Sequence, residues 1–390
     1  LSCYRKRRMF FFIRLCSLAV VGALFVFAVR ADDVAGDGGR LTLQQAEALW
    51  RAHSHEVKLA GMAVGGAGAD AVAAEQRPNP VLSLGVSSLS HDPGIGSGGL
   101  RDKMMDSVVG LSQTFERGDK RALRMANAKW KLAAAREDLA DTLRAQRMTL
   151  VEAYYGLKLA QETNRIATDY AALYQHTRKA AELRLKAGDL AGADVMRLRV
   201  EALRAQNDAI AAAAGLAQAK VALAYLIGRE HDADRLEAVD AWPDFTATPG
   251  MATDIAQRAD VRAASERERA AEAARDLARA QKSRDVNVGV SFEHNPTGSG
   301  WASNSYGVAV SFPLLWNYAY EGEIGRAESD LSAAEENLAM VRAQAVADLA
   351  RVASDLAGAR ERARHTDAEL VNEARKAADA AEFAFAHGAM

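Results

Sequence analysis

The sequence repeats one order of predicted elements, and this duplication limits the folds open to the chain. Each copy has a helical stretch, two short strands and then a long helical stretch. The first repeat, 32–228, predicts a helix over 41–77, strands over 81–90 and 107–116, and helices over 119–186 and 190–227. After a linker at 229–252, the second repeat, 253–390, predicts a helix over 253–283, strands over 286–293 and 304–312, and a helix over 319–387. The predicted fold is mainly α with a small β part.

The long helical segments contain no proline, and the chain has 83 alanines among its 390 residues. Alanine is the best helix former, and its small side chain lets neighbouring helices approach closely. A helix over 119–186 would be about 100 Å long at ~1.5 Å per residue. Aromatic residues make up only 6% of the chain, which disfavours a thick globular enzyme core.

The predicted strands alternate between apolar residues and small or polar ones, so that each has one apolar face. The residues expected on that face are Leu82, Leu84, Val86, Val109, Leu111, Val288, Val290, Tyr306, Val308 and Val310. In a soluble protein this face would pack on a helix. In a membrane protein it would face lipid, and the strand lengths are close to the ~9–11 residues that cross a bilayer. Both alternatives are open at this point.

The membrane alternative carries a requirement of its own. Four strands cannot close a barrel, and an open sheet edge in lipid leaves backbone groups unpaired. The chain would therefore have to oligomerise, and three copies would supply twelve strands.

The N-terminal residues 1–31 have the features of a secretory signal peptide. Basic residues at 5–8 precede an apolar run from Leu15 to Val29, and small residues follow. An N-terminal membrane anchor is the alternative. Removing the six basic side chains of this segment changes the net charge from −2 to −8 and removes both cysteines. The charge excludes a strongly basic nucleic-acid binder, and two cysteines cannot form a disulfide framework.

The residues show no constellation for catalysis, a cofactor or a resident metal. His53 and His55 are two apart, and on a helix such residues point in nearly opposite directions. The positions of greatest functional interest lie where the first long helix turns back. Gly188 would end that helix, and Asp189, Leu190 and Asp194 follow it. In a three-fold assembly each acidic residue would form a ring that concentrates cations. Alternatively, Asp189 or Asp194 caps the returning helix.

The sequence resembles the TolC-like outer-membrane efflux proteins, in the branch that serves cobalt–zinc–cadmium type exporters of the resistance-nodulation-division class. The motifs are Leu41-Thr42-Leu43, the Arg77-Pro78-Asn79-Pro80 run, the string from Leu111 to Arg121, Ala187-Gly188, Phe312-Pro313-Leu314 and Gly322-Glu323-Ile324. The resemblance implies a homotrimer with a twelve-stranded β-barrel in outer-membrane lipid and an α-helical barrel across the periplasm. It also implies a periplasmic adaptor protein and an inner-membrane pump as partners.

The second repeat reaches a tip glycine, Gly388, that matches Gly188, and the printed sequence then stops. We therefore expect a C-terminally truncated chain whose second returning helix is missing. The predicted function is a passive exit duct, most naturally for heavy-metal cations, with no enzyme activity and no cofactor. Efflux of drugs or other small molecules is the alternative within the family. A non-channel periplasmic coiled-coil scaffold is the alternative outside it.

Overall fold

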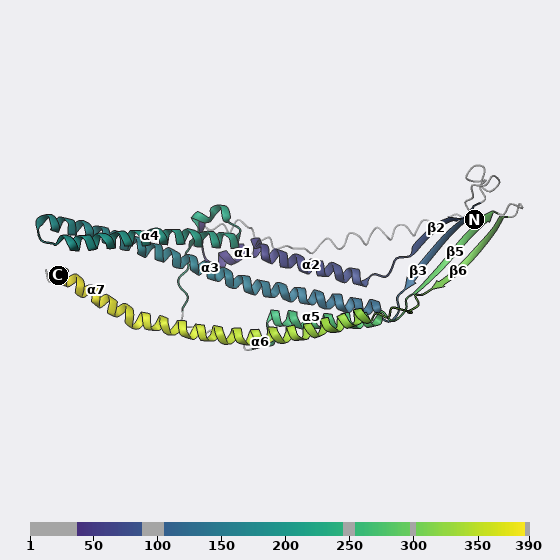
Figure 1. Ribbon diagram of the computed structural model, residues 1–390. Helices are drawn as coiled ribbons and strands as arrows, with labels where there is room; N and C mark the ends of the chain where they lie inside the picture. The colour runs from purple at the N-terminus through teal and green to yellow at the C-terminus, as the bar shows by residue number, and fades with distance from the viewer. Residues whose placement is uncertain (1–36, 88–104, 245–253, 297–301, 387–390) are drawn as a thin grey trace, which may run out of the picture. The chain divides into compact units, whose positions relative to one another are not determined.

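The computed structural model describes residues 37–87, 105–244, 254–296 and 302–386 (Figure 1). The predicted signal peptide and Gly388 lie outside these residues. The chain forms two compact units, one from 1–54 with 149–241 and the other from 55–148 with 242–390. These units differ from the two predicted repeats, because the long helix α3, Lys120–Ala187, contributes to both units.

The second unit contains one four-stranded antiparallel sheet. Its strands are β2 (Val81–Ser87), β3 (Asp106–Phe115), β5 (Val286–Pro296) and β6 (Ala302–Ser311), in the order β2-β3-β5-β6. Each predicted hairpin thus forms, and β3 pairs with β5 to join them. The four strands lie side by side in Figure 1. Their alternating sequences fit this arrangement because only one face needs to be apolar.

The helices of this unit are α2 (His55–Glu75), the first part of α3, α5 (Ala259–Ala280), α6 (Glu321–His365) and α7 (Val371–Ala386). A π-helical turn, Thr366–Leu370, lies between α6 and α7, where the sequence predicts one helix over 319–387. The small core between α5 and α6 contains Val261, Ala264, Leu338 and Ala345. Its alanines bring the two helices close together, as Figure 1 shows.

One ion pair lies within the start of α5, and another joins this helix to α3. Arg258 pairs with Asp260 at 2.7 Å, and this hydrogen bond lowers the pKa of the Asp260 carboxyl group. Arg262 reaches Glu137 on α3 at 2.6 Å. The predicted helix over 253–283 begins later than expected, at Ala259, because a 3-10 turn at Ile255–Gln257 precedes it.

The first unit contains α1 (Leu43–His53), the remainder of α3 and α4 (Gly192–Ile227). A two-stranded parallel sheet joins β1 (Arg40–Leu41) to β4 (Glu237–Ala238). The predicted linker thus contains a strand and a 3-10 turn, Glu230–Arg235, before residue 245. The fully buried core includes Leu41, Trp50, Leu150, Tyr154, Leu157, Leu223 and Ile227.

Tyr154 is the polar centre of this core. Its hydroxyl donates to the Leu41 carbonyl at 2.8 Å and accepts from the backbone N–H of Asp240 at 3.2 Å. Burial raises the pKa of the Tyr154 hydroxyl to about 12. The spacing of Leu150, Tyr154 and Leu157 places all three on one face of α3, as a helix seam requires.

The sequence predicts a single helix over 41–77, and this prediction is wrong in one respect. The backbone breaks at Ser54, whose φ of −53° and ψ of 124° are not helical, so that α1 and α2 are separate helices. Thr42 starts α1 with a reciprocal capping box with Gln45. No proline or glycine marks the break at Ser54 in the sequence.

Candidate membrane-facing sheet and helical tip

The sheet places all ten strand residues predicted to share an apolar face on one face. The register aligns Leu82 with Leu111, Leu111 with Val290, and Val290 with Val308. Nine of the ten side chains are exposed, and Val288 is half-buried. Phe292 and Tyr306 form a cross-strand aromatic pair on the same face, with ring centroids 5.4 Å apart. We call these ten residues, with Phe115 and Phe292, the apolar sheet face.

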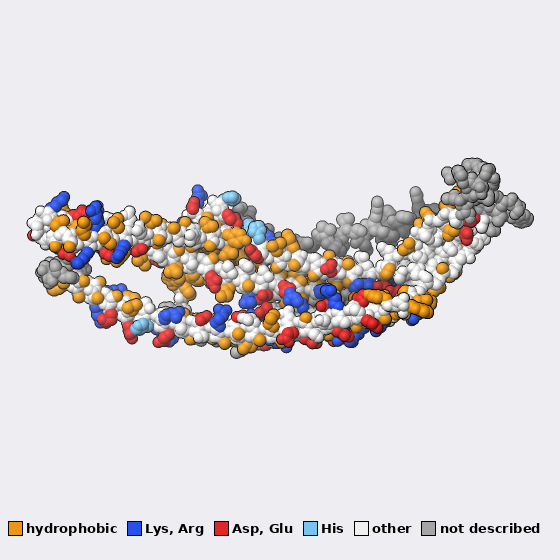
Figure 2. All heavy atoms as spheres, viewed as in Figure 1, with side chains coloured by type: hydrophobic (Ala, Val, Ile, Leu, Met, Phe, Trp, Pro, Cys, Tyr) orange, Lys and Arg blue, Asp and Glu red, His pale blue; other side chains and the backbone are white. Residues whose placement is uncertain are grey.

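The opposite face has small residues where the strands pass one another. A Cβ added at Gly110 would lie 2.5 Å from the Ser83 hydroxyl oxygen, and one added at Gly307 would lie 2.6 Å from that of Ser291. The strands therefore use glycine and serine in place of large side chains. In Figure 2, hydrophobic and uncharged atoms cover the visible part of the sheet, while charged side chains lie mainly along the helices.

No helix among the described residues covers the apolar sheet face, since all of its side chains are exposed except those of Val288 and Phe292, which are half-buried. The soluble arrangement, in which this face packs on a helix of the same chain, is therefore absent from the part of the chain that the structure describes. Within the same residues, β2 and β6 each pair on one side only and form the two edges of the sheet.

A charged cluster joins the sheet to the helices, and we call it the junction cluster: Glu116, Lys120, Arg124 and Asp285. Lys120 is only 6% exposed, and its Nζ lies 2.9 Å from Asp285 Oδ1, which also accepts the Arg117 backbone N–H at 3.0 Å. Arg124 holds Glu116 through two hydrogen bonds of 2.7 and 3.1 Å, and these lower the pKa of the Glu116 carboxyl group. The cluster ties the start of α3 to the segment before β5.

The sequence reasoning did not identify the junction cluster as a set of contacts. In the sequence analysis, residues 111–121 serve only as a motif of the family resemblance. Five charged residues lie at 116–121, directly after a strand, and this was the available signal, since buried charges need partners. The partner of Lys120, Asp285, lies 165 residues away in the chain.

At the predicted tip, α3 ends at Ala187 and Gly188 adopts a left-handed φ of 86°. The Gly188 N–H donates to the Leu185 carbonyl at 3.1 Å, and the Asp189 N–H donates to the Arg184 carbonyl at 2.9 Å. These two bonds form a Schellman motif, in which glycine is favoured because other residues are strained at positive φ.

The acidic residues beside the tip do not cap the returning helix. Helix α4 begins at Gly192, not at 190, and its N-cap residue Ala191 has no side-chain hydrogen bond. Asp189 is exposed and Leu190 is half-buried. Asp194 lies in the first turn of α4, where the helix dipole favours a negative charge, and pairs with Arg197 at 3.2 Å. The capping alternative is therefore wrong for both aspartates.

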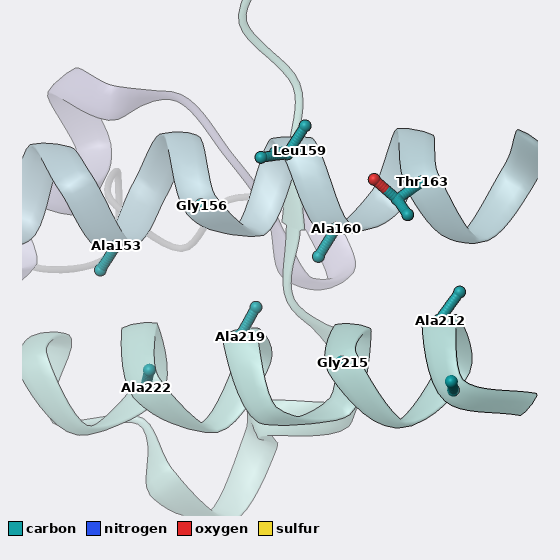
Figure 3. A pocket seen from close by; sticks show the side chains of 10 residues that line it. Ala153, Gly156, Leu159, Ala160, Thr163, Ala212, Gly215, Ala219 and Ala222 are labelled. Carbon is teal, nitrogen blue, oxygen red and sulfur yellow. The ribbon is translucent and has the colours of Figure 1, made fainter. Parts of the chain in front are cut away.

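Small residues of α3 and α4 line a pocket of about 500 Å³ (Figure 3). Figure 3 shows Ala153, Gly156 and Ala160 of α3 facing Ala212, Gly215 and Ala219 of α4 across the gap. The lining has no charged side chain and one hydroxyl, that of Thr163. The pocket therefore offers shape and apolar surface but no groups for acid, base or nucleophilic chemistry.

Two further features bear on function. No group of three or more His, Cys, Asp or Glu side chains among the described residues could hold a metal ion. By length and composition alone, α2 and α4 are apolar enough to cross a membrane. Both helices also contain many alanines and some glycines, small residues that suit close packing between helices.

Residues 43–229 match the outer membrane efflux protein family. The cobalt-zinc-cadmium resistance protein CzcC of Cupriavidus metallidurans is 27% identical over 190 residues, which are 49% of this chain and 43% of that protein. This chain therefore aligns with less than half of the length of that relative.

Solved structures share the fold at low sequence identity. The outer membrane protein VceC of Vibrio cholerae has a TM-score of 0.70 at 19% identity, covering 89% of this chain and 86% of that one. The Campylobacter jejuni outer membrane channel CmeC has a TM-score of 0.71 at 14% identity, covering 89% and 77%. Residues 43–229 are therefore similar to the outer membrane efflux proteins, and the chain shares the fold of solved outer-membrane channel proteins.

Proposed function

We propose that the chain is the outer-membrane channel of a tripartite efflux system. Three copies would each contribute four strands to a twelve-stranded barrel, and their helices would form a tunnel through the periplasm. The observation that carries this proposal is the apolar sheet face, which is exposed along four strands with two open edges.

The dimensions and chemistry of the sheet suit a bilayer. Strands β3 and β5 have 10 and 11 residues, which matches the ~9–11 residues that span the hydrocarbon region at a tilt. An outward apolar face and an inward face of serine and glycine are the alternation of transmembrane barrels. In lipid the edges β2 and β6 require partner strands, and further copies of the chain would supply them.

The helices also support an assembly of several copies. Large apolar side chains of α4 are exposed, among them Met196, Leu203 and Ile210. Only Ala74 of α2 is buried. Neighbouring copies would cover these surfaces as the wall of a tunnel. A non-channel scaffold explains exposed helices equally well but gives no reason for an uncovered apolar sheet.

The cargo and the partners are proposed from the similarity to outer membrane efflux proteins. The chain would conduct passively, while an inner-membrane pump supplies the energy through a periplasmic adaptor. The similarity to a cobalt-zinc-cadmium resistance protein favours heavy-metal cations as cargo. Gly188, Asp189, Leu190 and Asp194 would form the gate and adaptor contact, since exposed carboxylates at a three-fold constriction attract cations.

Conductance tests the channel function. Purified chain added to a planar lipid bilayer should give discrete conductance steps, and a boiled sample of the same preparation should give none.

Cells that lack the outer-membrane part of a metal exporter should regain zinc and cobalt tolerance when they express the chain. Membrane insertion without any conductance would contradict a channel. Conductance with restored drug tolerance, but no metal tolerance, would favour the small-molecule alternative.

A further inference from the structure

A second pocket, of about 530 Å³, lies at the base of the sheet. It is lined by Arg77, Pro78, Gln113, Thr114, Phe115, Glu116 and Arg121. Arg77 lies in the segment between α2 and β2, and Arg121 lies in the first turn of α3. The pocket therefore adjoins the place where the strands meet the helices. We propose that it binds the phosphate group of an anionic phospholipid in the periplasmic leaflet. This inference rests on the proposed membrane position of the sheet.

Two guanidinium groups of this pocket have N–H donors that no described protein group accepts. Arg121 Nε donates to the Glu75 carbonyl at 2.7 Å, which fixes the side chain. Among the described residues, its two terminal nitrogens and the whole Arg77 side chain have no hydrogen-bond or ion-pair partner. A guanidinium group offers paired N–H donors that match two phosphate oxygens.

The acidic residue of the pocket does not cancel this charge. Both oxygens of Glu116 are held by Arg124, at 2.7 and 3.1 Å, so that its negative charge is already paired. Three more basic residues with exposed side chains, Arg117, Lys282 and Arg284, lie in the turns that lead into α3 and β5. These basic side chains outnumber the exposed carboxylates of Glu75 and Asp119 at the base of the sheet, and this excess of positive charge attracts anionic lipid.

The apolar part of the pocket favours a lipid over a free anion. Phe115 is 55% exposed and belongs to the apolar sheet face, and Gln113 and Leu111 precede it on the same side of β3. A phosphate held by Arg77 and Arg121 would thus lie where an acyl chain could continue along Phe115 and Leu111. Gln113 is the polar residue in this row, and its amide donates to the Pro78 carbonyl at 2.8 Å.

The test compares Arg77→Gln/Arg121→Gln with Arg199→Gln/Arg342→Gln, which removes two exposed arginines of α4 and α6. Each full chain is reconstituted in nanodiscs with equal amounts of phosphatidylglycerol and phosphatidylcholine, released into detergent, and analysed by native mass spectrometry for retained lipid. Wild type and control should retain phosphatidylglycerol preferentially. The pocket variant should lose about thirtyfold of that preference, because it removes two basic side chains that each contribute ~1 kcal/mol near an anionic surface. Arg77→Lys should lose less, because it keeps the charge but not the paired donors.

Two results would overturn the inference: an unchanged lipid preference in the pocket variant, or displacement of phosphatidylglycerol by millimolar inorganic phosphate. Conductance of the same preparations separates this inference from the proposed function. A pocket variant that conducts normally and keeps its lipid preference refutes the lipid site alone. A wild-type chain that neither inserts nor conducts refutes the channel, and the lipid site falls with it. Should the pocket variant fail to insert, Arg77→Gln alone gives the comparison.

Discussion

Val308→Arg is expected to remove the chain from the folded outer-membrane fraction, whereas Ala309→Arg is expected to leave it there. The two residues are neighbours on β6 and point to opposite faces of the sheet. Val308 is 78% exposed on the apolar sheet face and pairs with Val290. An arginine facing lipid near the middle of a bilayer destabilises the inserted barrel by about 2–4 kcal/mol, and each copy in an assembly would contribute this destabilisation.

This pair of variants distinguishes a sheet that lies in the membrane from a sheet in a soluble protein. Both positions are exposed in the chain itself, so a soluble scaffold would tolerate either arginine with a change of about 0.5 kcal/mol or less. The measurement is the amount of heat-modifiable protein recovered from outer membranes, together with refolding yield in lipid vesicles. Equal recovery of both variants would contradict a lipid-facing position for Val308.

Asp285→Ala is expected to lower the free energy of unfolding by about 2–4 kcal/mol. It removes the partner of Lys120, whose charge is then buried without compensation, and it leaves the Arg117 N–H without its acceptor. Asp285 is 31% exposed, which places the effect below that of a fully buried pair. The double variant Lys120→Met/Asp285→Leu should lose less than Asp285→Ala, because it removes the buried charge together with its partner.

Chemical unfolding in detergent, followed by circular dichroism, measures this effect. Asp169→Ala is the matched control, since the Arg165–Asp169 pair at 3.2 Å is 64% and 68% exposed and should contribute about 0.5 kcal/mol or less. If Asp285→Ala and Asp169→Ala unfolded at the same denaturant concentration, the junction cluster would not stabilise the chain.

The sheet was predictable because each strand carries its own pattern. Alternation along β3 and β6 assigns every residue to a face, and the register then aligns Leu111 with Val290 and Val290 with Val308. The long helices were predictable for a similar reason, since alanine-rich segments without proline favour helix along their whole length.

The features that sequence reasoning missed depend on contacts between distant residues. The break at Ser54 has no local breaker, and Lys120 meets Asp285 only because the sheet places their segments together. The capping hypothesis was wrong because Ala191 occupies the N-cap position, so that Asp189 lies before the cap and Asp194 lies within the first turn of α4. Their role at a gate stays a prediction, because it concerns surfaces that neighbouring copies and an adaptor would share.

Crosslinking between the edge strands tests the central claim, that several copies close the sheet into one barrel. In a Cys3→Ser/Cys16→Ser background, a cysteine at Leu84 of β2 is combined in turn with one at Tyr306, Val308 or Val310 of β6. Cysteines at Val109 and Phe292, which are paired within one sheet, serve as the control. The account predicts that at least one edge pair yields covalent dimers and trimers and nothing larger, while the control pair stays monomeric. Edge pairs that give only monomers, or an unlimited ladder, would contradict a closed three-chain barrel.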